Sequence, residues 1–247
     1  MTEFTIGIAG RKIKICALYE YAKEYCQAYL TDGQPDFTVA ICPEDVDFER
    51  KKADRENEVE GLPHVDYQPE YLETLAIYRK IAEKMLDYNA FLFHGSALSV
   101  DGKGFLFTAK SGTGKSTHTR IWKGALAKRC LMVNDDKPLL LVNEDGVMVC
   151  GTPWDGKHRL STNIVVPLKG LAILERGKEN EINPVEPAEA LPLLLQQSYR
   201  PADPVALTKT LNLLKRVMEI VPLYRLKCTI SLEAARVAYL GMNRKDQ

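Results

Sequence analysis

The chain has 247 residues, of which 45% are hydrophobic and 27% are charged. This is the composition of an ordinary globular protein, and the length suits one large domain or two unequal ones. Thirty-three basic residues balance thirty-three acidic ones, so no overall field favours nucleic acid or an anionic membrane. No apolar run has the length of a membrane span, and the amino terminus lacks the pattern of a signal peptide. We therefore expect a cytoplasmic protein without nucleic-acid or membrane partners.

The six cysteines form no C-x-x-C pair, and most of them lie inside apolar runs. This distribution indicates buried, reduced thiols in a cytosolic protein. A disulfide framework or a zinc site is the alternative interpretation.

We interpret residues 1–88 as a small α+β accessory region without nucleotide chemistry of its own. Its charged, proline-bounded segment 44–60 is typical of a flexible or edge segment. The other expected elements are a hairpin over 4–15, an aromatic-rich helix over 19–30, a strand over 37–41 and an amphipathic helix over 71–86.

From residue 89 onward, strands and helices are mixed, which predicts an α/β domain over 89–247. Residues 91–100 predict one strand, Asp101-Gly102 a tight turn, and 104–108 the returning strand. The elements expected after these are a strand at 130–133, a hairpin of 139–142 and 147–150, a loop at 151–159, a strand at 171–174, helices at 187–199 and 204–220, a strand at 223–226 and a short final helix.

The segment A-K-S-G-T-G-K-S-T, from Ala109 to Thr117, has the spacing of the phosphate-binding motif G-x-x-x-x-G-K-[ST], with Ala in the first place. Gly112 and Gly114 let backbone N–H groups turn toward a polyphosphate, and Lys115 can reach its outer oxygens. A linker rich in glycine and serine is the alternative. The residues expected to bind the nucleotide are Ser111, Gly112, Thr113, Gly114, Lys115, Ser116 and Thr117, with the Ser116 hydroxyl also a ligand of Mg²⁺.

The context of this motif supports the phosphate-binding interpretation. A short apolar strand precedes it, and Ile121, Trp122, Ala125 and Leu126 follow at helical spacing. The helix would direct the positive end of its dipole at the bound anion. The preceding strand is the second arm of a hairpin, whereas most P-loop proteins use a strand of a purely parallel sheet.

Two adjacent carboxylates follow the next predicted strand. Asp135 comes twenty residues after Lys115, one helix and one strand later, so the chain has returned to the same edge of the sheet. One carboxylate, Asp135, can hold Mg²⁺, and the other, Asp136, can take a proton from an attacking hydroxyl. A simple strand-ending turn is the alternative interpretation.

Other polar residues near these motifs have two possible roles. His94 lies on the strand that leads to the hairpin, where it is either a core residue or part of the site. His118, on the first turn of the expected helix, could contact a phosphate or pack. Asn134 and Lys137 flank the two aspartates and could support them.

The loop from Gly151 to Ser161 is predicted to be mobile and to bind an anionic part of the acceptor. Gly151 and Gly156 would let it close over the ligand. A solvated turn is the alternative. The residues expected to bind the acceptor are Trp154, Lys157 and Arg159.

The order of these motifs resembles the catalytic domain of HPr kinase/phosphorylase, which is structurally akin to phosphoenolpyruvate carboxykinases. The motifs are His94-Gly95, then a hairpin, then Ser111 to Ser116, then Asp135-Asp136. The resemblance covers about 91–140 and implies a mixed-sheet P-loop kinase core over 89–247. It also implies roles: Lys115 binds ATP phosphates, Ser116 binds Mg²⁺, Asp136 is the catalytic base and His94 lies beside it.

The chain departs from that family in one respect. We find no counterpart of its glutamate-glycine loop for metal and substrate; the segment 151–157 takes its place and resembles uncharacterised bacterial relatives. HPr is therefore not the acceptor that we expect.

The expected function is that of an ATP- and Mg²⁺-dependent kinase that phosphorylates a hydroxyl, such as a serine of a protein, a peptide or a small molecule. The alternatives are a phosphorylase or carboxykinase-like enzyme using the same site, and a nucleotide-binding regulatory module without turnover. Because members of the resembling family are often oligomers, the resemblance also implies a homo-oligomer.

Overall fold

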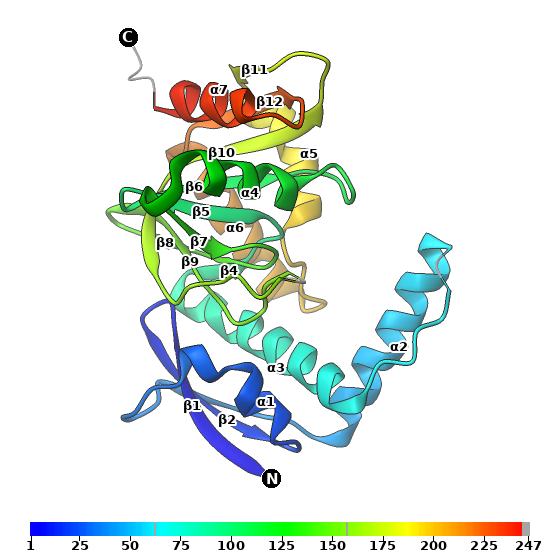
Figure 1. Ribbon diagram of the computed structural model, residues 1–247. Coiled ribbons are helices and arrows are strands. Elements are labelled where there is room, and N and C mark those ends of the chain that lie inside the picture. Colours follow the sequence, from blue (N-terminus) through cyan, green and yellow to red (C-terminus); the bar gives the residue numbers. More distant parts are fainter. Residues whose placement is uncertain (62, 157, 244–247) are drawn as a thin grey trace. The chain divides into compact units, whose positions relative to one another are not determined.

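The computed structural model describes residues 1–61, 63–156 and 158–243. The chain forms two compact units, Met1–Lys84 and Met85–Gln247, which are coloured from blue to red along the sequence in Figure 1. Both units mix helices with sheet, so the fold is mixed α/β.

The first unit contains a three-stranded sheet. Strand β1 (Thr2–Ile8) is antiparallel to β2 (Arg11–Ala17), which is parallel to β3 (Phe37–Ala40). The predicted hairpin is confirmed. The single helix expected over 19–30 is instead a short helix α1 (Tyr21–Tyr25) followed by a 3-10 turn η1 (Gln27–Tyr29).

The charged segment expected to be flexible is an 18-residue helix, α2 (Pro43–Glu60), so that prediction was wrong. Pro43 stands in the first turn, a capping box joins Cys42 and Asp45, and Gly61 ends the helix in the left-handed conformation at φ 66°. Lys, Arg and Glu in its interior are good helix formers, so the polarity of the segment does not oppose a helix.

Helix α3 (Pro69–Met85) agrees with the amphipathic helix expected over 71–86. Its Arg79 donates hydrogen bonds to the buried Glu49, at 2.6 Å, and to Asp45, at 3.2 Å, both on α2. The polar helix α2 is therefore held by ion pairs that are largely shielded from water.

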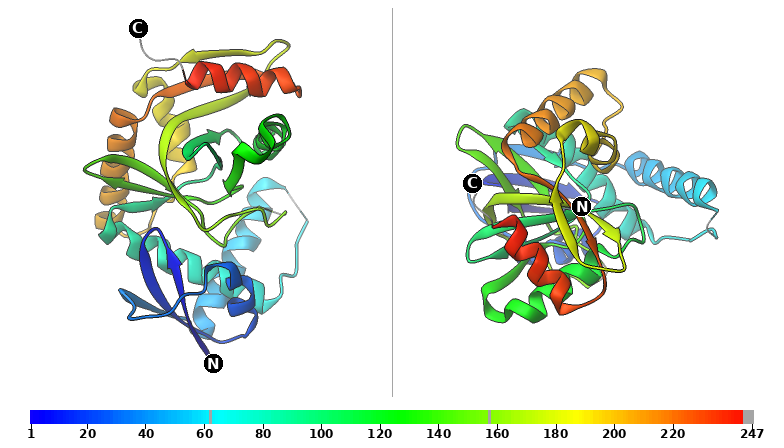
Figure 2. Two further views of the ribbon diagram at one scale, coloured as in Figure 1. Left: turned by 60° about the vertical axis from the view of Figure 1, so that its left-hand side comes forward. Right: turned by 90° about the horizontal axis from the view of Figure 1, so that it is seen from above.

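The described part of the second unit contains a nine-stranded mixed sheet, in which the order β4-β8-β9-β10-β6-β5-β7 is extended by β12 and β11. Figure 2 shows it from two further sides. The long strand β10 lets the sheet curl, because its start pairs antiparallel with β9 and its end pairs parallel with β6 and β12. The strands are β4 (Ala90–Leu92), β5 (Ser96–Val100), β6 (Lys103–Thr108), β7 (Cys130–Asn134), β8 (Leu139–Asn143), β9 (Gly146–Cys150), β10 (Val165–Arg176), β11 (Glu181–Pro184) and β12 (Leu223–Cys228).

Helices cover both faces of this sheet. Phe105 and Phe107 of β6 belong to a core cluster with Trp122 and Ala235, whereas Leu106 between them belongs to another cluster with Leu194. Since neighbouring residues of a strand point to opposite faces, α4 and α7 lie on one face and α5 and α6 on the other. The helices are α4 (Lys115–Leu126), α5 (Pro187–Gln197), α6 (Pro204–Ile220) and α7 (Leu232–Met242), with 3-10 turns η2 (Leu86–Tyr88) and η3 (Ala127–Arg129).

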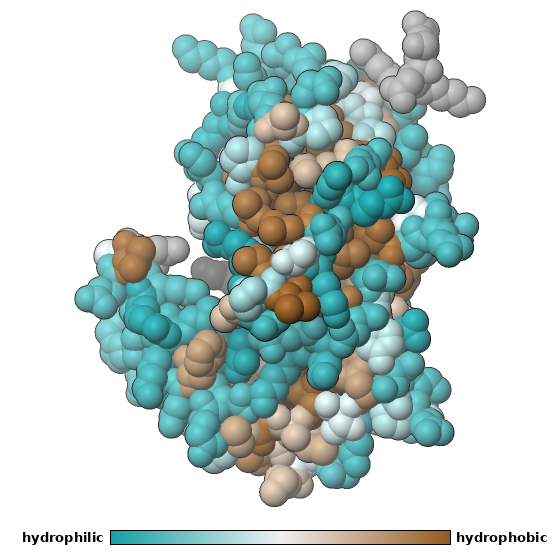
Figure 3. Space-filling model, turned by 180° about the vertical axis from the view of Figure 1, so that it is seen from behind, coloured by the Kyte–Doolittle hydropathy of each residue, from teal (hydrophilic) through white to brown (hydrophobic). Residues whose placement is uncertain are grey.

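Two features of the surface concern possible contacts. None of the helices in the described ranges is both long enough and apolar enough to cross a bilayer. Figure 3 shows apolar side chains exposed on one face of the second unit; on α6, the exposed large apolar residues are Val205, Leu211 and Ile220.

The single strand expected over 91–100 is two strands with different partners: β4 pairs with β8, and β5 pairs with β6 and β7. The extended strand is interrupted between them at His94 and Gly95. A side chain at Gly95 would come within 2.9 Å of Leu106 Cδ1 and 3.0 Å of the Phe107 carbonyl oxygen. Glycine therefore permits the close approach that takes the chain from one pairing to the next.

The pairing pattern determines which strand ends meet. Strands β6 and β7 are both antiparallel to β5, β10 is parallel to β6, and β12 is parallel to β10. The carboxyl ends of β6, β7, β10 and β12 therefore lie along one edge of the sheet, and the segments that follow these strands emerge there.

The first unit should lose stability in acid through Asp45. Burial opposes ionisation of this carboxyl, but Lys80 at 2.6 Å and the N–H of Cys42 outweigh it and lower its pKa from 3.8 to about 2. A carboxyl whose pKa is lower in the folded state than in the unfolded state stabilises the fold at pH values above its unfolded-state pKa. This stabilisation is lost as the pH falls through the folded-state pKa. Asp45→Asn should therefore flatten the decline of the unfolding free energy between about pH 4 and pH 2.

Urea unfolding of the full chain at a series of pH values, followed by circular dichroism, measures this slope. The exposed Asp47, on the same helix, provides the control Asp47→Asn, which should leave the slope unchanged. An equal change in both variants would contradict the role of the Lys80 pair.

Candidate functional site

The glycine-rich loop, residues 109–114, joins β6 to α4. Gly112 and Gly114 have φ values of 73° and 118°, a conformation that other residues rarely adopt. An added Cβ would meet nothing within 4 Å at either position, so the backbone angles, and not space, require glycine. Because α4 begins at Lys115, the free N–H groups of its first turn face the hollow of this loop.

Lys115 is half-buried at the start of α4, and its Nζ donates to the carbonyl oxygen of Ala109 at 3.3 Å. Burial lowers the pKa of Lys115, while the charges of Asp136 and Asp135 raise it, and burial prevails. The loop cation and the two aspartates predicted from sequence are therefore electrostatic neighbours.

Asp135 is only 4% exposed. Its Oδ1 accepts hydrogen bonds from Ser96 Oγ at 2.6 Å and Thr119 Oγ1 at 3.5 Å. This fixes the carboxylate between β5 and α4, one turn beyond the glycine-rich loop.

Asp135 and Ser116 offer hard oxygen ligands, which suit Mg²⁺. Across the described residues, no group of three or more His, Cys, Asp and Glu side chains could enclose a metal ion. A Mg²⁺ ion held mainly by phosphates and water needs only one or two protein ligands, so the donor set fits that ion.

Asp136 lies against His94, whose Nε2 is 3.3 Å from Oδ1; both side chains are partly exposed. The backbone of Asp136 is fixed as well, because its carbonyl oxygen accepts the N–H of Gly95 at 3.0 Å. Burial raises the pKa of Asp136, but the hydrogen bond from His94 and the positive charges of Lys137, His94 and Lys115 outweigh it, so the pKa lies below its usual value.

Asn134 is the fully buried residue that organises the end of β7. Its Nδ2 donates to Thr152 O, Thr152 Oγ1 and Trp154 O at 3.0, 2.9 and 3.3 Å. Its Oδ1 accepts the N–H groups of Asp136 and Lys137 at 2.8 and 2.7 Å. One amide therefore holds both the turn that carries Asp136 and the start of the 151–161 loop.

The sequence predicted that the 151–161 loop is mobile and binds the acceptor. In the structure, contacts within the protein hold this loop in place. Trp154 is 2% exposed, so its ring packs inside the protein and forms no exposed wall. Arg159 pairs with the buried Asp155, at 3.4 Å, and is therefore engaged within the loop. Lys157, the third predicted acceptor residue, lies outside the described residues.

Gly151 does not serve the loop as a hinge. A Cβ at Gly151 would lie 1.9 Å from the Thr162 carbonyl oxygen and 2.9 Å from that of Val133. The role of this glycine is therefore close backbone packing against the edge of β7.

His118 is a packing residue. It is 3% exposed, its ring lies 4.8 Å from that of Phe107, and its Nε2 accepts the indole N–H of Trp122 at 2.9 Å. Burial lowers the pKa of His118 to about 4, so the ring is neutral at physiological pH. These contacts support the packing alternative for His118, which also lines the cavity beside the loop.

A cavity of about 520 Å³ opens beside the glycine-rich loop. One wall is α4, and the other consists of the ends of β10 and β12. It is lined by Gly112, Thr113, Gly114, Thr117, His118, Ile121, Leu174, Glu175, Arg176, Gly177, Cys228, Thr229 and Ile230. Its mixture of apolar walls and a few polar groups is typical of a small-molecule site.

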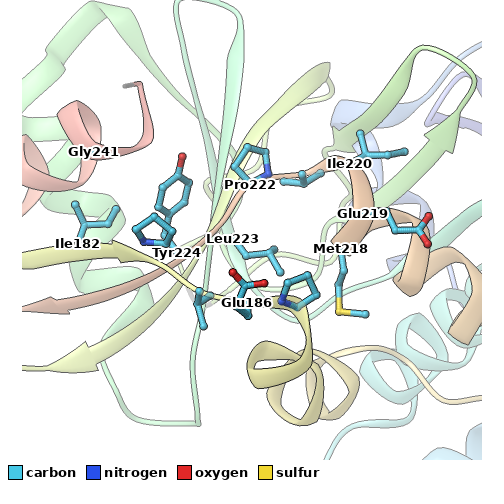
Figure 4. A pocket seen from close by; sticks show the side chains of 13 residues that line it. Ile182, Glu186, Met218, Glu219, Ile220, Pro222, Leu223, Tyr224 and Gly241 are labelled. Carbon is cyan, nitrogen blue, oxygen red and sulfur yellow. The ribbon is translucent and has the colours of Figure 1, made fainter. Parts of the chain in front are cut away.

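A larger cavity, of about 1090 Å³, lies between β11, β12 and the ends of α5 and α6. Figure 4 shows Met218, Leu223, Tyr224, Glu186 and Glu219 among the side chains that line it. None of the residues predicted for the site lines this larger cavity, whereas Gly112, Thr113, Gly114 and Thr117 line the smaller one. We therefore take the smaller cavity as the candidate ligand cavity.

Several residues of the site were missed in the sequence. Ser96 and Thr119 hold Asp135, and Arg176 Nη2 donates to Gly112 O at 2.7 Å. Thr119 stands four residues after Lys115, on the same face of α4, which was a usable signal. Ser96 and Arg176 reach the site only through strand pairing, which their local sequence does not reveal.

Replacing the amide of Asn134 by a carboxylate should destabilise the second unit. In Asn134→Asp, the side chain would present an oxygen to three acceptor oxygens and could no longer donate to them. We expect a loss of about 2–4 kcal/mol in unfolding free energy. Urea unfolding followed by the fluorescence of Trp122 and Trp154 measures it, and the exposed Asn143 supplies the control Asn143→Asp. Equal unfolding midpoints in the two variants would contradict the assigned role.

Among the comparisons with known proteins, one family model matches the chain. No curated protein matches it. A solved structure described as the Hpr(Ser) kinase/phosphatase from Coxiella burnetii matches with 12% identity and a TM-score of 0.35, covering 61% of this chain and 95% of that chain; a similarity this weak supports no conclusion about activity. The family model described as "SynChlorMet cassette protein ScmC" matches residues 62–234, well over half of the sequence. The chain therefore belongs to the ScmC family.

Proposed function

We propose that this protein is an ATP- and Mg²⁺-dependent kinase that transfers the γ-phosphoryl group to a hydroxyl, such as a serine of a protein, a peptide or a small molecule. The observation that carries the proposal is that Asp135 accepts a hydrogen bond from Thr119, one turn after Lys115 on the helix that follows a loop with two left-handed glycines. The loop supplies anion-binding N–H groups, and the Asp135-Asp136 pair supplies a metal ligand and a base.

The cavity beside the loop supports a nucleotide in preference to a free phosphate. The ligand's phosphates would lie over Gly112 to Gly114, and its uncharged part would enter the space between α4 and the ends of β10 and β12. Leu174, Ile121 and Ile230 provide apolar contacts there, as a nucleoside requires.

The proposed transfer uses few protein groups. The acceptor oxygen attacks the γ-phosphorus, the bond from that phosphorus to the β-γ bridging oxygen breaks, and the hydroxyl proton passes to Asp136. Lys115 and the loop N–H groups compensate the charge on the phosphate oxygens. Mg²⁺, held by Ser116 and Asp135, would neutralise the remaining phosphate charge.

A nucleotide-responsive module without turnover is the second candidate. The observation that favours it is the 3.3 Å contact between His94 Nε2 and Asp136 Oδ1, which engages the proposed base and lowers its pKa. A carboxylate with a lowered pKa is a weaker base. Transfer of phosphate from ATP to an acceptor distinguishes the two functions.

Lys115→Ala should abolish tight binding of Mg·ATP while the protein stays folded. The variant removes the cation at the phosphates from a half-buried position where its charge is poorly screened. We expect a loss of at least about tenfold in affinity. Calorimetric titration measures it, and Lys110→Ala, at an exposed position in the same loop, is the control. Equal affinities for Lys115→Ala and wild type would eliminate the loop as the nucleotide site.

Asp136→Asn should separate binding from chemistry. The amide keeps the size of the side chain but cannot take the proton, so transfer should fall about a hundredfold or more with little change in ATP affinity. Asp135→Asn should instead weaken Mg²⁺-dependent nucleotide binding as well as the rate. Single-turnover transfer and nucleotide titration are measured on both variants. Transfer at the wild-type rate by Asp136→Asn would refute the base and favour the second candidate.

A further inference from the structure

Arg176 stands at the carboxyl end of β10, next to the glycine-rich loop. Strand β10 is parallel to β6, with Ile173 opposite Thr108. The residues that follow Ile173 therefore lie beside the glycine-rich loop, which follows Thr108. Arg176 Nη2 donates to the carbonyl oxygen of Gly112 at 2.7 Å. The guanidinium thus approaches the loop from one side of β6, whereas Asp135, which follows β7, lies on the other side.

Within the described ranges, Arg176 carries a charge that no carboxylate neutralises. Among the described residues, no Asp or Glu forms an ion pair with it, and the side chain is exposed. Arg225, on the neighbouring β12, differs in this respect, because it pairs with both Glu175 and Glu189. Two arginines therefore stand at the strand ends beside the loop. The charge of Arg225 is neutralised by glutamates, and that of Arg176 is available to an anion.

Arg176 also lines the 520 Å³ cavity together with Gly112 and Gly114. A ligand that fills the cavity and extends its anionic end over the loop must pass this guanidinium. A guanidinium has five N–H donors in a fixed plane, and the bond to Gly112 uses one of them. Donors remain for phosphate oxygens without loss of the contact to the loop.

We propose that Arg176 is a second phosphate-binding cation, placed at the side of the glycine-rich loop where the cavity opens, and that it selects phosphate-bearing ligands over nucleosides. The inference rests on the proposed nucleotide site. Arg176 has two effects there: it holds Gly112 in its left-handed conformation before the ligand arrives, and it contributes charge-assisted hydrogen bonds to the bound phosphates. Lys115 serves the same anion from the far end of the loop.

The test compares ligands that share the nucleoside but differ in phosphate. Adenosine, ADP, ATP and tripolyphosphate are titrated, in competition with a fluorescent ADP analogue, against wild type, Arg176→Ala and Arg176→Lys. Arg176→Ala should bind ADP, ATP and tripolyphosphate at least about tenfold more weakly and adenosine with unchanged affinity. Arg176→Lys should recover part of the loss, because it keeps the charge but not the planar fork.

The control is Lys178→Ala, which removes the same charge from an exposed position two residues away and should change none of the four affinities. An equal loss for adenosine and ATP in Arg176→Ala would reduce Arg176 to a structural support of Gly112, and unchanged affinities would remove it from the site; both results overturn the inference. Failure of wild type to bind any of the four ligands would instead overturn the proposed function.

Discussion

The side-chain amide of Asn134 is the interaction on which the site depends. It is fully buried at the end of β7. Its two N–H groups are shared among three oxygens of Thr152 and Trp154, and its oxygen accepts the N–H groups of Asp136 and Lys137. A buried amide with all of these partners favours one local conformation, because any alternative leaves polar groups without partners. A single side chain that faces no solvent therefore joins the backbone of the turn that carries Asp136 to the start of the 151–161 loop.

The sheet topology arranges the remaining groups on two sides of β6. On one side, β5 and β7 bring Ser96 and Asp135 to the first turns of α4. On the other side, β10 and β12 bring Arg176 and the cavity to the same loop. A ligand lying across the end of β6 would have its uncharged part on the second side and its reacting end on the first. In the proposed kinase, this division would separate the nucleoside from the acceptor.

The local parts of this arrangement could be predicted from the sequence. The two glycines, Lys115 and the periodic helix after them form a short contiguous pattern, and the strand, loop and helix are where it indicated. Prediction failed where tertiary contacts decide the outcome. Segment 44–60 is too polar to indicate a buried face, yet capping by Cys42 and Gly61 and ion pairs to Arg79 make it a helix. Trp154 was assigned to a binding surface, although the anchoring by Asn134 that draws its segment inward comes from twenty residues away.

The His94–Asp136 pair indicates which protonation state the site stabilises. Burial alone would favour a neutral carboxyl, but the positive charges around Asp136 outweigh burial and keep it ionised well below neutral pH. A hydroxyl could therefore meet a carboxylate that is already able to accept a proton. In the proposed function, the group that would take the proton is thus held by the end of β7 and by His94, and not by the ligand.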